Sequence, residues 1–363
     1  MKTAGVMAAL LVLAAFVFPL SNEAAIYLWS DWHDIAGTVL AAMLFVLAGW
    51  ATPFVAVPFG LVGVVIGCGE TLGLLGARDI HSHAALGYWL IVLGTWLAAA
   101  LCVTRLSHLQ GRFVDWLLPA IFGLFVFYLW EVAVRGFGVP SVLMPAPSAI
   151  LVRLAASLPV LGEDFVQTIL RGVLVGYAIG CGAGIAVAVL AHRFSFLERG
   201  LLPLGNLVSA LPIVGIAPIM VMWFGFDWPS KAAVVAVITF FPMLVNVLAG
   251  LAAAGAIERD LMRSYGSSYM QALGRLHLPA ALPFIFNALK INSTLALIGA
   301  IVAEFFGTPT RGIGFRISIE IARMSLDMVW AEITLAAVAG MAFYGLIALA
   351  ERAATFWHPS YRD

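Results

Sequence analysis

The sequence predicts an all-α integral membrane protein with about ten transmembrane helices. Two observations lead to this fold class. First, the 363 residues are 63% hydrophobic and only 10% charged, whereas soluble domains have about 45–50% apolar and about 25% charged residues. Second, the apolar residues form repeated runs of about 20 residues, the length that crosses a bilayer as a helix. We therefore expect membrane lipid as a partner, and the formal net charge of zero gives no indication of a nucleic-acid partner.

The first four spans are predicted within residues 1–112. The run at 4–20 follows Lys2 and is either a retained span or a cleaved signal peptide; the weak cleavage site behind it favours a span. The apolar stretch that begins at Ile35 is too long for one span, and Thr52-Pro53 divides it. The four spans are predicted at 4–20, 35–51, 53–75 and 84–103.

Six more spans are predicted in residues 113–363. Between the first two lies a proline-rich segment, Val139–Ser148, which cannot form a helix and is expected outside the hydrocarbon. A short surface helix is expected at 149–158 and a polar loop at 307–327. The six spans are predicted at 116–134, 165–191, 201–224, 231–254, 280–306 and 328–350.

Two of these spans have unusual residues. Pro203, Pro212 and Pro218 interrupt the span at 201–224, and such breaks are tolerated where protein or a water-filled cavity satisfies the freed backbone groups. The span at 165–191 carries small residues at every fourth position, which make one smooth helix face and allow another helix to approach closely. These small residues are Gly172, Gly176, Gly180 and Gly184.

The charged residues predict an orientation. If the first residue is cytoplasmic, most short basic loops face the cytoplasm, as the positive-inside rule requires, and both termini are cytoplasmic. The acidic loop at 21–34 and the proline-rich segment then face outward. The loop at 307–327 is an exception, because it carries three arginines on the outer side.

The longest polar interval in the second half of the chain is 257–279. Leu261, Tyr265 and Tyr269 are among apolar residues that recur at helical spacing, so the interval is expected to be amphipathic helix. Gly266 and the serines after it predict two short helices joined by a turn. Pro279 suits the first turn of the next helix. The residues alone allow either a docking site for a soluble partner or an ordinary connector between spans.

This interval resembles the cytoplasmic coupling loop of binding-protein-dependent ABC importer permeases. Asp260-Leu261-Met262 stands in the place of the family's Glu-Ala-Ala, Gly266 falls on its glycine, Leu276 replaces its isoleucine and Leu278-Pro279 matches. Further matches in the same order resemble the nitrate/sulfonate/taurine-type subgroup. They include Met144-Pro145-Ala146-Pro147-Ser148, Trp223-Phe224-Gly225, Ser230-Lys231, Ala303-Glu304 and Arg311-Gly312-Ile313-Gly314.

The resemblance implies a type I ABC importer permease core of six helices in residues 113–363, preceded by about four accessory helices in residues 1–112. It implies a multi-pass protein of the bacterial inner membrane. The implied partners are an ABC ATPase subunit, a second permease subunit in a homodimer, and an extracytoplasmic solute-binding protein. The implied ATPase-coupling residues are Asp260, Arg263, Gly266, Leu276, Leu278 and Pro279.

The implied solute is small: nitrate/sulfonate/taurine-like or thiamine-pyrimidine/riboflavin-like. The alternative function is an ion-coupled secondary transporter, which would usually show related halves and intramembrane carboxylates. No catalytic residues, no metal site and no cofactor are expected in this chain. It has no G-x-x-x-x-G-K-[ST] sequence, so ATP is expected to be used by the partner ATPase. His81-x-His83 and the scattered Cys68, Cys102 and Cys181 give no zinc or disulfide pattern.

Polar residues within the predicted spans are candidates for the pathway, because such residues in a membrane usually pair or face a cavity. Glu304 and Arg171 are expected to pair or to flank the outer pathway. Asn246, Asn292 and Ser293 either line the pathway or join helices by hydrogen bonds. Lys290 is expected to extend to the membrane interface.

Overall fold

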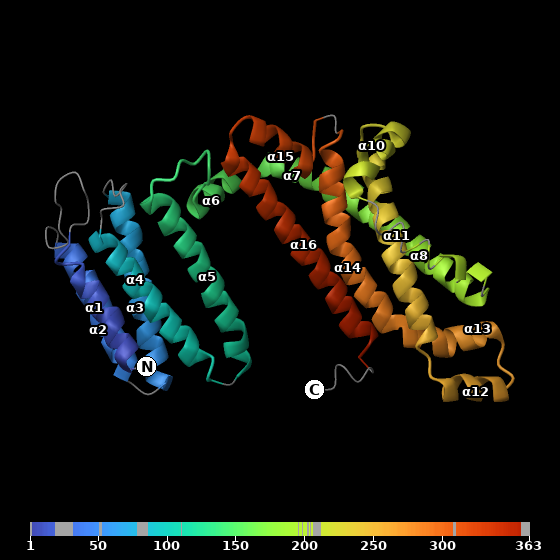
Figure 1. Ribbon diagram of the computed structural model, residues 1–363, viewed down its shortest axis with the longest axis horizontal. Helices are drawn as coiled ribbons and strands as arrows, with labels where there is room; N and C mark the ends of the chain where they lie inside the picture. The colour runs from blue at the N-terminus through green and yellow to red at the C-terminus, as the bar shows by residue number, and fades with distance from the viewer. Residues whose placement is uncertain are drawn as a thin grey trace. The chain divides into compact units, whose positions relative to one another are not determined.

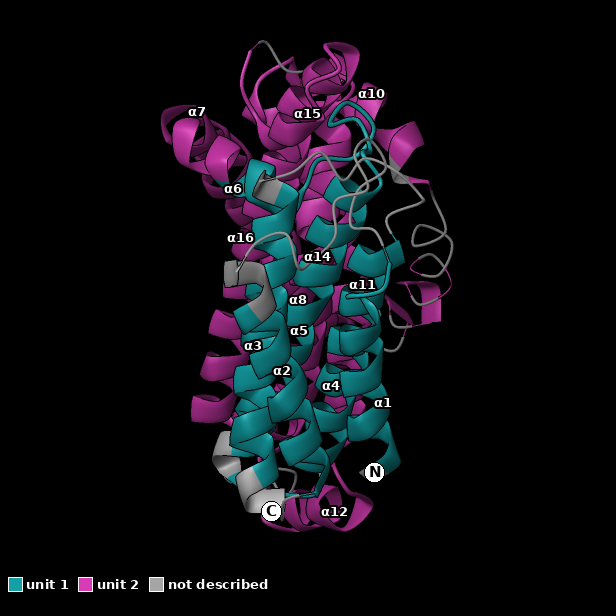
Figure 2. Ribbon diagram, turned by 90° about the vertical axis from the view of Figure 1, so that its left-hand side faces the viewer, with its two compact units in different colours: residues 1–151 teal, residues 152–363 magenta. Residues whose placement is uncertain are grey.

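The computed structural model describes residues 2–18, 32–50, 53–77, 86–109, 111–194, 196–197, 199–201, 203, 205, 212–307 and 310–356. All regular structure in these residues is helical. The chain divides into two compact units, Met1–Leu151 and Val152–Asp363 (Figure 2). His81 and His83 lie outside the described residues.

Unit 1 holds a bundle of four helices and a fifth helix packed against it (Figure 1). Its core contains Phe45, Tyr88 and Ile91, each at most 1% exposed. The fifth helix is tied to the bundle by a buried hydrogen bond of 2.7 Å between Tyr128 Oη and Thr71 Oγ1. The helices are α1 (Lys2–Ala14), α2 (Trp32–Trp50), α3 (Pro53–Ala77), α4 (Leu86–Leu106) and α5 (Arg112–Gly136).

The proline-rich segment is not helical from Val139 to Ala146, as predicted, but its last two residues, Pro147 and Ser148, begin a helix. It leads into α6 (Pro147–Ala156), which confirms the predicted surface helix. Pro147 opens α6 because its fixed φ suits a first helical turn, where an N–H group has no partner to lose. The predicted domain boundary at residue 112 lies within this compact unit, and the extent of the transport core stays a prediction.

Unit 2 is organised around α11, which packs against α8 and α14. α16 packs against α14, and α15 against both. α12 lies at the opposite end of this unit from α15 (Figure 1). The elements are α7 (Leu158–Phe165), the π-helical segment η2 (Val166–Val173), α8 (Leu174–Arg193), α10 (Ile213–Phe224), α11 (Trp228–Ala252), α12 (Ala256–Ser264), α13 (Tyr269–Ala272), the π-helical segment η3 (Leu273–His277), α14 (Leu278–Glu304), α15 (Ile313–Ala322) and α16 (Leu326–Ala354).

The predicted small-residue face of α8 packs directly on α11. A Cβ added at Gly176, Gly180 or Gly184 would collide with backbone or side-chain atoms of α11. Gly172 has more room, since its nearest neighbours would lie 3.6 Å from an added Cβ. The close approach of α8 and α11 is therefore confirmed, and it depends on three of the four glycines.

Seven helices of the described residues are long and apolar enough to cross a membrane. They match seven of the predicted spans. The predicted spans at 4–20, 35–51 and 201–224 correspond to shorter apolar helices, so the total of ten stays a prediction. The seven are Ala56–Leu75, Leu86–Leu106, Val114–Gly136, Leu158–Arg193, Trp228–Ala252, Tyr269–Glu304 and Leu326–Ala354.

Two local predictions were wrong. The loop predicted at 307–327 contains α15, because Ile313 and Ile317 recur at helical spacing and bury one face of that helix. The polar interval does not end in a separate short helix before Pro279. Instead α13, η3 and α14 run on as one helical path from Tyr269 to Glu304. The π-helical segment η3 ends at His277, two residues before Pro279, which cannot donate the usual backbone hydrogen bond.

Candidate functional site

The polar interval forms an elbow, defined here as residues 256–279. α12 ends at Ser264, and the chain turns at Gly266 with φ +65°, a left-handed conformation that favours glycine. Ser268 then starts α13 with a capping box. Its side chain accepts a hydrogen bond from Gln271 N, and Gln271 Oε1 accepts one from Ser268 N. The predicted turn between two helices is confirmed.

The second half of the elbow is anchored to the membrane helices. Tyr269 Oη donates to the backbone oxygen of Val189 at 3.3 Å, and the guanidinium of Arg193 lies 4.5 Å from the centre of the Tyr269 ring. His277 Nδ1 lies 2.8 Å from the backbone oxygen of Leu251. These contacts join α13 and η3 to the ends of α8 and α11.

The first half of the elbow is uncovered. No residue of α12 is buried, and the exposed fractions of Ile257, Leu261 and Tyr265 are 82%, 54% and 80%. Asp260 and Arg263 form an ion pair of 3.5 Å that is exposed at both ends, so it contributes little stability. Leu276, Leu278 and Pro279 lie beyond the turn and are half-buried. The predicted coupling residues are thus divided: some lie on the exposed helix α12, and the others lie on the helical path that is anchored to the membrane helices.

A groove lies beside the turn, where the end of α8 meets the start of α13. Its volume is about 450 Å³. Val189, Leu190 and Arg193 line it from α8, and Ser268, Tyr269 and Met270 line it from the elbow. The basic end of α8 lies just beyond the span predicted at 165–191, and its role in shaping the elbow was not predicted.

A second constellation, the polar cluster, lies at the other end of unit 2. We define it as Asp164, Thr168, Lys231, Glu304 and Arg316. Glu304 is 2% exposed and accepts hydrogen bonds of 2.7 Å from Thr168 Oγ1 and Gly314 N. Asp164 is fully buried and accepts from Gly312 N at 2.5 Å and Arg316 Nε at 2.9 Å. The cluster therefore pins the start of α15 to α7, η2 and α14.

Lys231 ties two loops together within this cluster. It is 1% exposed, and its ammonium donates to the backbone oxygens of Phe226, at 2.6 Å, and of Gly307. Glu332 of α16 is fully buried near Asp164 and Arg316, and its carboxyl oxygens have no donor among the described residues. A buried ammonium is costly unless it is hydrogen-bonded, which explains why Lys231 lies against two backbone oxygens.

Next to the cluster, η2 is linked to the loop before α11. Gln167 Nε2 donates to Asp227 Oδ1 at 2.8 Å. This bond, and one from the backbone of Trp228, hold the pKa of Asp227 below its ordinary value. Arg171 is exposed and donates to Gln167 Oε1 at 3.4 Å. The structure gives Glu304 the partners Thr168 and Gly314, and the alternative that Glu304 and Arg171 flank the outer pathway stays a prediction.

The remaining candidate residues lie between helices. Asn292 is fully buried and its side-chain nitrogen donates to the backbone oxygen of Thr239 at 2.8 Å and to Cys181 Sγ at 3.3 Å. The bond of Asn246 is to the backbone oxygen of Pro242, and Ser293 bonds to the backbone oxygen of Lys290. Asn292 thus joins α14 to α11 and α8.

Lys290 was expected to extend to the membrane interface, which stays a prediction, and the structure adds a partner for it. Its ammonium pairs with Glu351 Oε2 at 2.7 Å, with the two side chains 20% and 10% exposed. The ion pair joins α14 to α16. A carboxylate within reach on a packed helix satisfies the ammonium without access to water.

Comparison with known proteins identifies the family of the chain. The chain matches the family described as binding-protein-dependent transport system inner membrane component over residues 178–362. The chain belongs to this family. It is a permease subunit of the ABC importer type, and it is a membrane transport component rather than an enzyme.

Several curated relatives of the permease are named for their transport systems. The formylaminopyrimidine transport permease protein ThiX of Halalkalibacterium halodurans is 33% identical over 201 residues, which cover 54% of this chain and 78% of the relative. The putative aliphatic sulfonates transport permease protein SsuC of Bacillus subtilis is 29% identical over 248 residues, 68% of this chain and 87% of the relative. The taurine transport system permease protein TauC of Escherichia coli is 31% identical over 207 residues, 56% of this chain and 70% of the relative.

The polar cluster gives a physical reason for sequence matches that lie far apart in the permease. Ser230-Lys231, Ala303-Glu304 and Gly312-Ile313-Gly314 were recognised only by their order along the chain. In the structure Glu304 and the backbone amides of residues 312–314 share one buried network with Asp164 and Thr168, and Lys231 lies near enough to Glu304 for an electrostatic interaction. Asp164, Arg316 and Glu332 belong to the same region and were missed, because nothing in their local sequence shows that they are buried.

Proposed function

We propose that the permease forms, with a second copy of itself, the pathway of an importer driven by a separate ATPase that docks on α12. ATP is bound and hydrolysed in that partner, and this chain holds no cofactor. A solute-binding protein delivers the solute on the opposite side of the membrane. Asp260, Arg263 and Gly266 then belong to the docking half of the elbow, and Leu276, Leu278 and Pro279 belong to the half that passes the motion on.

The exposed helix α12 is the observation that carries this proposal. A helix with uncovered apolar residues needs either lipid or a partner groove. Helices that lie on lipid usually have a polar face rich in Lys and Arg. α12 instead carries Glu258 and Asp260 beside Arg259 and Arg263, which suits the mixed charges of a protein surface. α12 also lies next to a turn of the chain, a position that suits a helix displaced by a docked partner.

The anchored half of the elbow supplies the mechanical link. α13, η3 and α14 form one continuous helical path, so a displacement of the elbow moves the membrane helix as well. The contacts of Tyr269 with Val189 and Arg193 extend the link to α8. The groove beside Met270 is large enough for side chains of the docked partner. The elbow therefore connects a docking surface to two membrane helices.

The orientation that we propose places α12 and both termini in the cytoplasm of a bacterial cell. The basic short loops support it by the positive-inside rule. The arginines at 311–323, the exception to that rule, each have an acidic partner: Arg311 pairs with Glu163, Arg316 with Asp164 and Arg323 with Glu320. The rule counts Lys and Arg and gives little weight to acidic residues, so these three arginines remain an exception to the proposed orientation.

The names of the relatives support a small solute for this permease, of the sulfonate/taurine or pyrimidine/riboflavin kind. Arg171, Asn246, Asn292, Ser293 and Glu304 remain candidates for the pathway. Arg171 is the exposed cation among them and is the one we propose for contact with an anionic solute at the outer side.

The test is co-purification of the permease with its ATPase in mild detergent, followed by measurement of ATP hydrolysis. We expect Leu261→Asp to abolish co-purification by placing a charge in the docking surface. Gly266→Val should weaken it, because a β-branched residue is strained at φ +65°. Gly274→Ala is the matched control, since an added Cβ at Gly274 meets nothing within 4 Å.

Two results would reject the proposal. If Leu261→Asp and Gly266→Val retain the ATPase as well as the wild type does, the elbow is not its docking site. If the purified permease moves solute on an ion gradient without an ATPase, the alternative of a secondary transporter is correct.

A further inference from the structure

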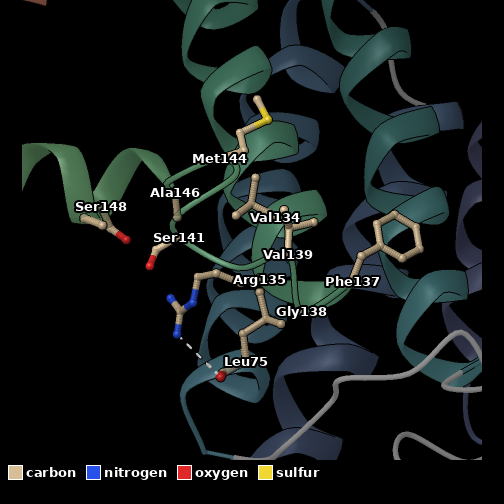
Figure 3. A pocket seen from close by; sticks show the side chains of 11 residues that line it. Leu75, Val134, Arg135, Phe137, Gly138, Val139, Ser141, Met144, Ala146 and Ser148 are labelled. Carbon is tan, nitrogen blue, oxygen red and sulfur yellow. Dashed lines mark hydrogen bonds between the residues drawn. The ribbon is translucent and has the colours of Figure 1, made fainter. Parts of the chain in front are cut away.

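Unit 1 contains a pocket of about 500 Å³ at the end of α5 (Figure 3). It is lined by the last turn of α5, the proline-rich segment, the first residues of α6 and Leu75 of α3. The volume is in the range of small-molecule sites, about 300–1,000 Å³. The pocket is distinct from the elbow and from the polar cluster, and the relatives' names assign it no role.

The chain builds this pocket with a fixed return loop. α5 ends at Gly136 and is followed by a left-handed Gly138 with φ +62°, and the N–H of Val139 donates back to the oxygen of Val134 at 2.9 Å. The loop then returns to α6, where Glu131 accepts hydrogen bonds from Ser148 N at 2.9 Å and Ser148 Oγ at 2.6 Å. Because both ends of the loop are tied to α5, the pocket exists without a ligand.

The cation of the pocket is Arg135, and its position is fixed by two bonds. Its guanidinium donates to Glu131 Oε1 at 3.2 Å and to the backbone oxygen of Leu75 at 3.4 Å. A guanidinium has five N–H groups, so donors remain for a ligand. The Arg135 side chain is 38% exposed and that of Glu131 only 9%, so the positive partner of this pair is the one that a ligand meets.

The rest of the lining separates into polar and apolar sides. Figure 3 shows the polar ends of Arg135, Ser141 and Ser148 on the side of α6, and Phe137 on the other side. Val139 and Met144 add further apolar surface. An oriented cation, a hydroxyl group and an apolar wall together recognise a molecule with an anionic head and a short apolar body.

We propose that this pocket binds a small amphipathic oxyanion, a carboxylate, sulfonate or phosphate monoester that carries a short apolar group. Arg135 and Ser141 hold the oxyanion, and Val139 and Met144 contact the apolar group. A pocket of about 500 Å³ cannot enclose the two acyl chains of a phospholipid, so a small soluble molecule fits it better than a lipid. The permease thereby has an anion site at the end of α5, separate from the elbow and from the polar cluster.

The test is calorimetric titration of the purified full-length permease with hexanesulfonate, hexanol and hexylammonium, which share one apolar chain and differ in charge. We expect binding of hexanesulfonate, at least tenfold weaker binding of hexanol and none of hexylammonium. Arg135→Gln should weaken hexanesulfonate binding at least tenfold. Met144→Trp, which fills the pocket but keeps the cation, should abolish it. Arg323→Gln removes another exposed arginine and should leave binding unchanged.

Three results would overturn the proposal. One is equal affinity for hexanol and hexanesulfonate, which indicates partition into apolar surface. Another is unchanged binding by a folded Met144→Trp variant, which decides the matter even if Arg135→Gln does not fold. The third is native mass spectrometry in which a phospholipid is retained by the wild type and lost from Met144→Trp, which would make the pocket a lipid headgroup site.

Discussion

Single residues of the polar cluster hold the α15 end of unit 2 together. Asp164 is fully buried, and its two oxygens accept from Gly312 N and Arg316 Nε. Removing one partner of a buried ion pair leaves the other charge uncompensated. Its neighbour Glu163 also pairs with an arginine, but both side chains of that pair are more than half exposed. The two adjacent carboxylates are therefore expected to differ sharply in their contributions to the stability of the fold.

Asp164→Asn should destabilise the permease by about 3–5 kcal/mol, the usual cost of breaking a buried ion pair. Glu163→Gln should cost less than about 1 kcal/mol, as is usual for exposed pairs. Thermal unfolding of the two variants in the same detergent measures the difference. Equal melting temperatures would show that the Asp164–Arg316 pair does not stabilise the fold.

The bond between Gln167 and Asp227 should make stability depend on pH at the acidic end. Because the folded pKa of Asp227 is lowered, the stabilisation is complete above the unfolded pKa of about 3.9 and is lost as the pH falls through the lower folded value. The effect is small, since Asp227 is exposed. We expect Gln167→Ala to lower the melting temperature slightly at pH 7 and to approach the wild type as the pH falls progressively below the unfolded pKa of about 3.9; a constant difference would contradict this.

At the scale of elements, the contact between α8 and α11 depends on backbone approach rather than on interlocking side chains. Gly176, Gly180 and Gly184 lie on the contact face, whereas Gly182 of the same helix has nothing within 4 Å of an added Cβ. Within lipid, such close packing replaces the hydrophobic effect as the source of helix association. A glycine of α8 is required for this packing only where it faces α11, so its orientation on the helix decides whether it can be replaced.

Gly180→Ala should therefore lower the melting temperature clearly, because the added methyl group would collide with Thr239 and the backbone of Ala236. Overpacking of this kind typically costs about 1–3 kcal/mol. Gly182→Ala should be neutral or stabilising by up to about 1 kcal/mol, since alanine is the better helix former. Unfolding curves of both variants test this, and a larger loss for Gly182→Ala would be inconsistent with the packing.

At the scale of the whole molecule, unit 1 is a helical bundle that ends in the oxyanion pocket, and unit 2 carries the elbow and the polar cluster. α5 packs on α3 and α4 within unit 1, although its residues belong to the predicted transport core. Deleting residues 1–112 would uncover the face of α5 around Tyr128 and Val132, both at most 9% exposed. Lipid can cover an apolar face, but it cannot restore the bond to Thr71.

We expect the chain that begins at residue 113 to retain its ATPase, because the elbow is intact, and to unfold at a lower temperature than the full chain. Co-purification and thermal unfolding measure the two effects separately. A folded truncated chain that loses the ATPase would show that the first four helices take part in coupling.

Much of the fold could be predicted because lipid imposes long apolar runs on a spanning helix. The elbow's turn was also predictable, since Gly266 interrupts a helical pattern where a left-handed residue is required. The helix α15 was missed because Arg311, Arg316 and Arg323 give its region the composition of a loop. The partners of Glu304 and Lys290 were also missed, because they are far away in the sequence.

The sequence by itself determined that this protein crosses a membrane, that α8 has one smooth face, and that residues 257–279 form a polar elbow. These follow from composition and short-range spacing, which act through the solvent and through local backbone geometry. Only the tertiary structure decided that Asp164, Glu304 and Arg316 share one buried network and that Arg135 faces a pocket. A buried charge is stabilised by whichever groups the fold brings within hydrogen-bond distance, and no local pattern specifies which groups those are.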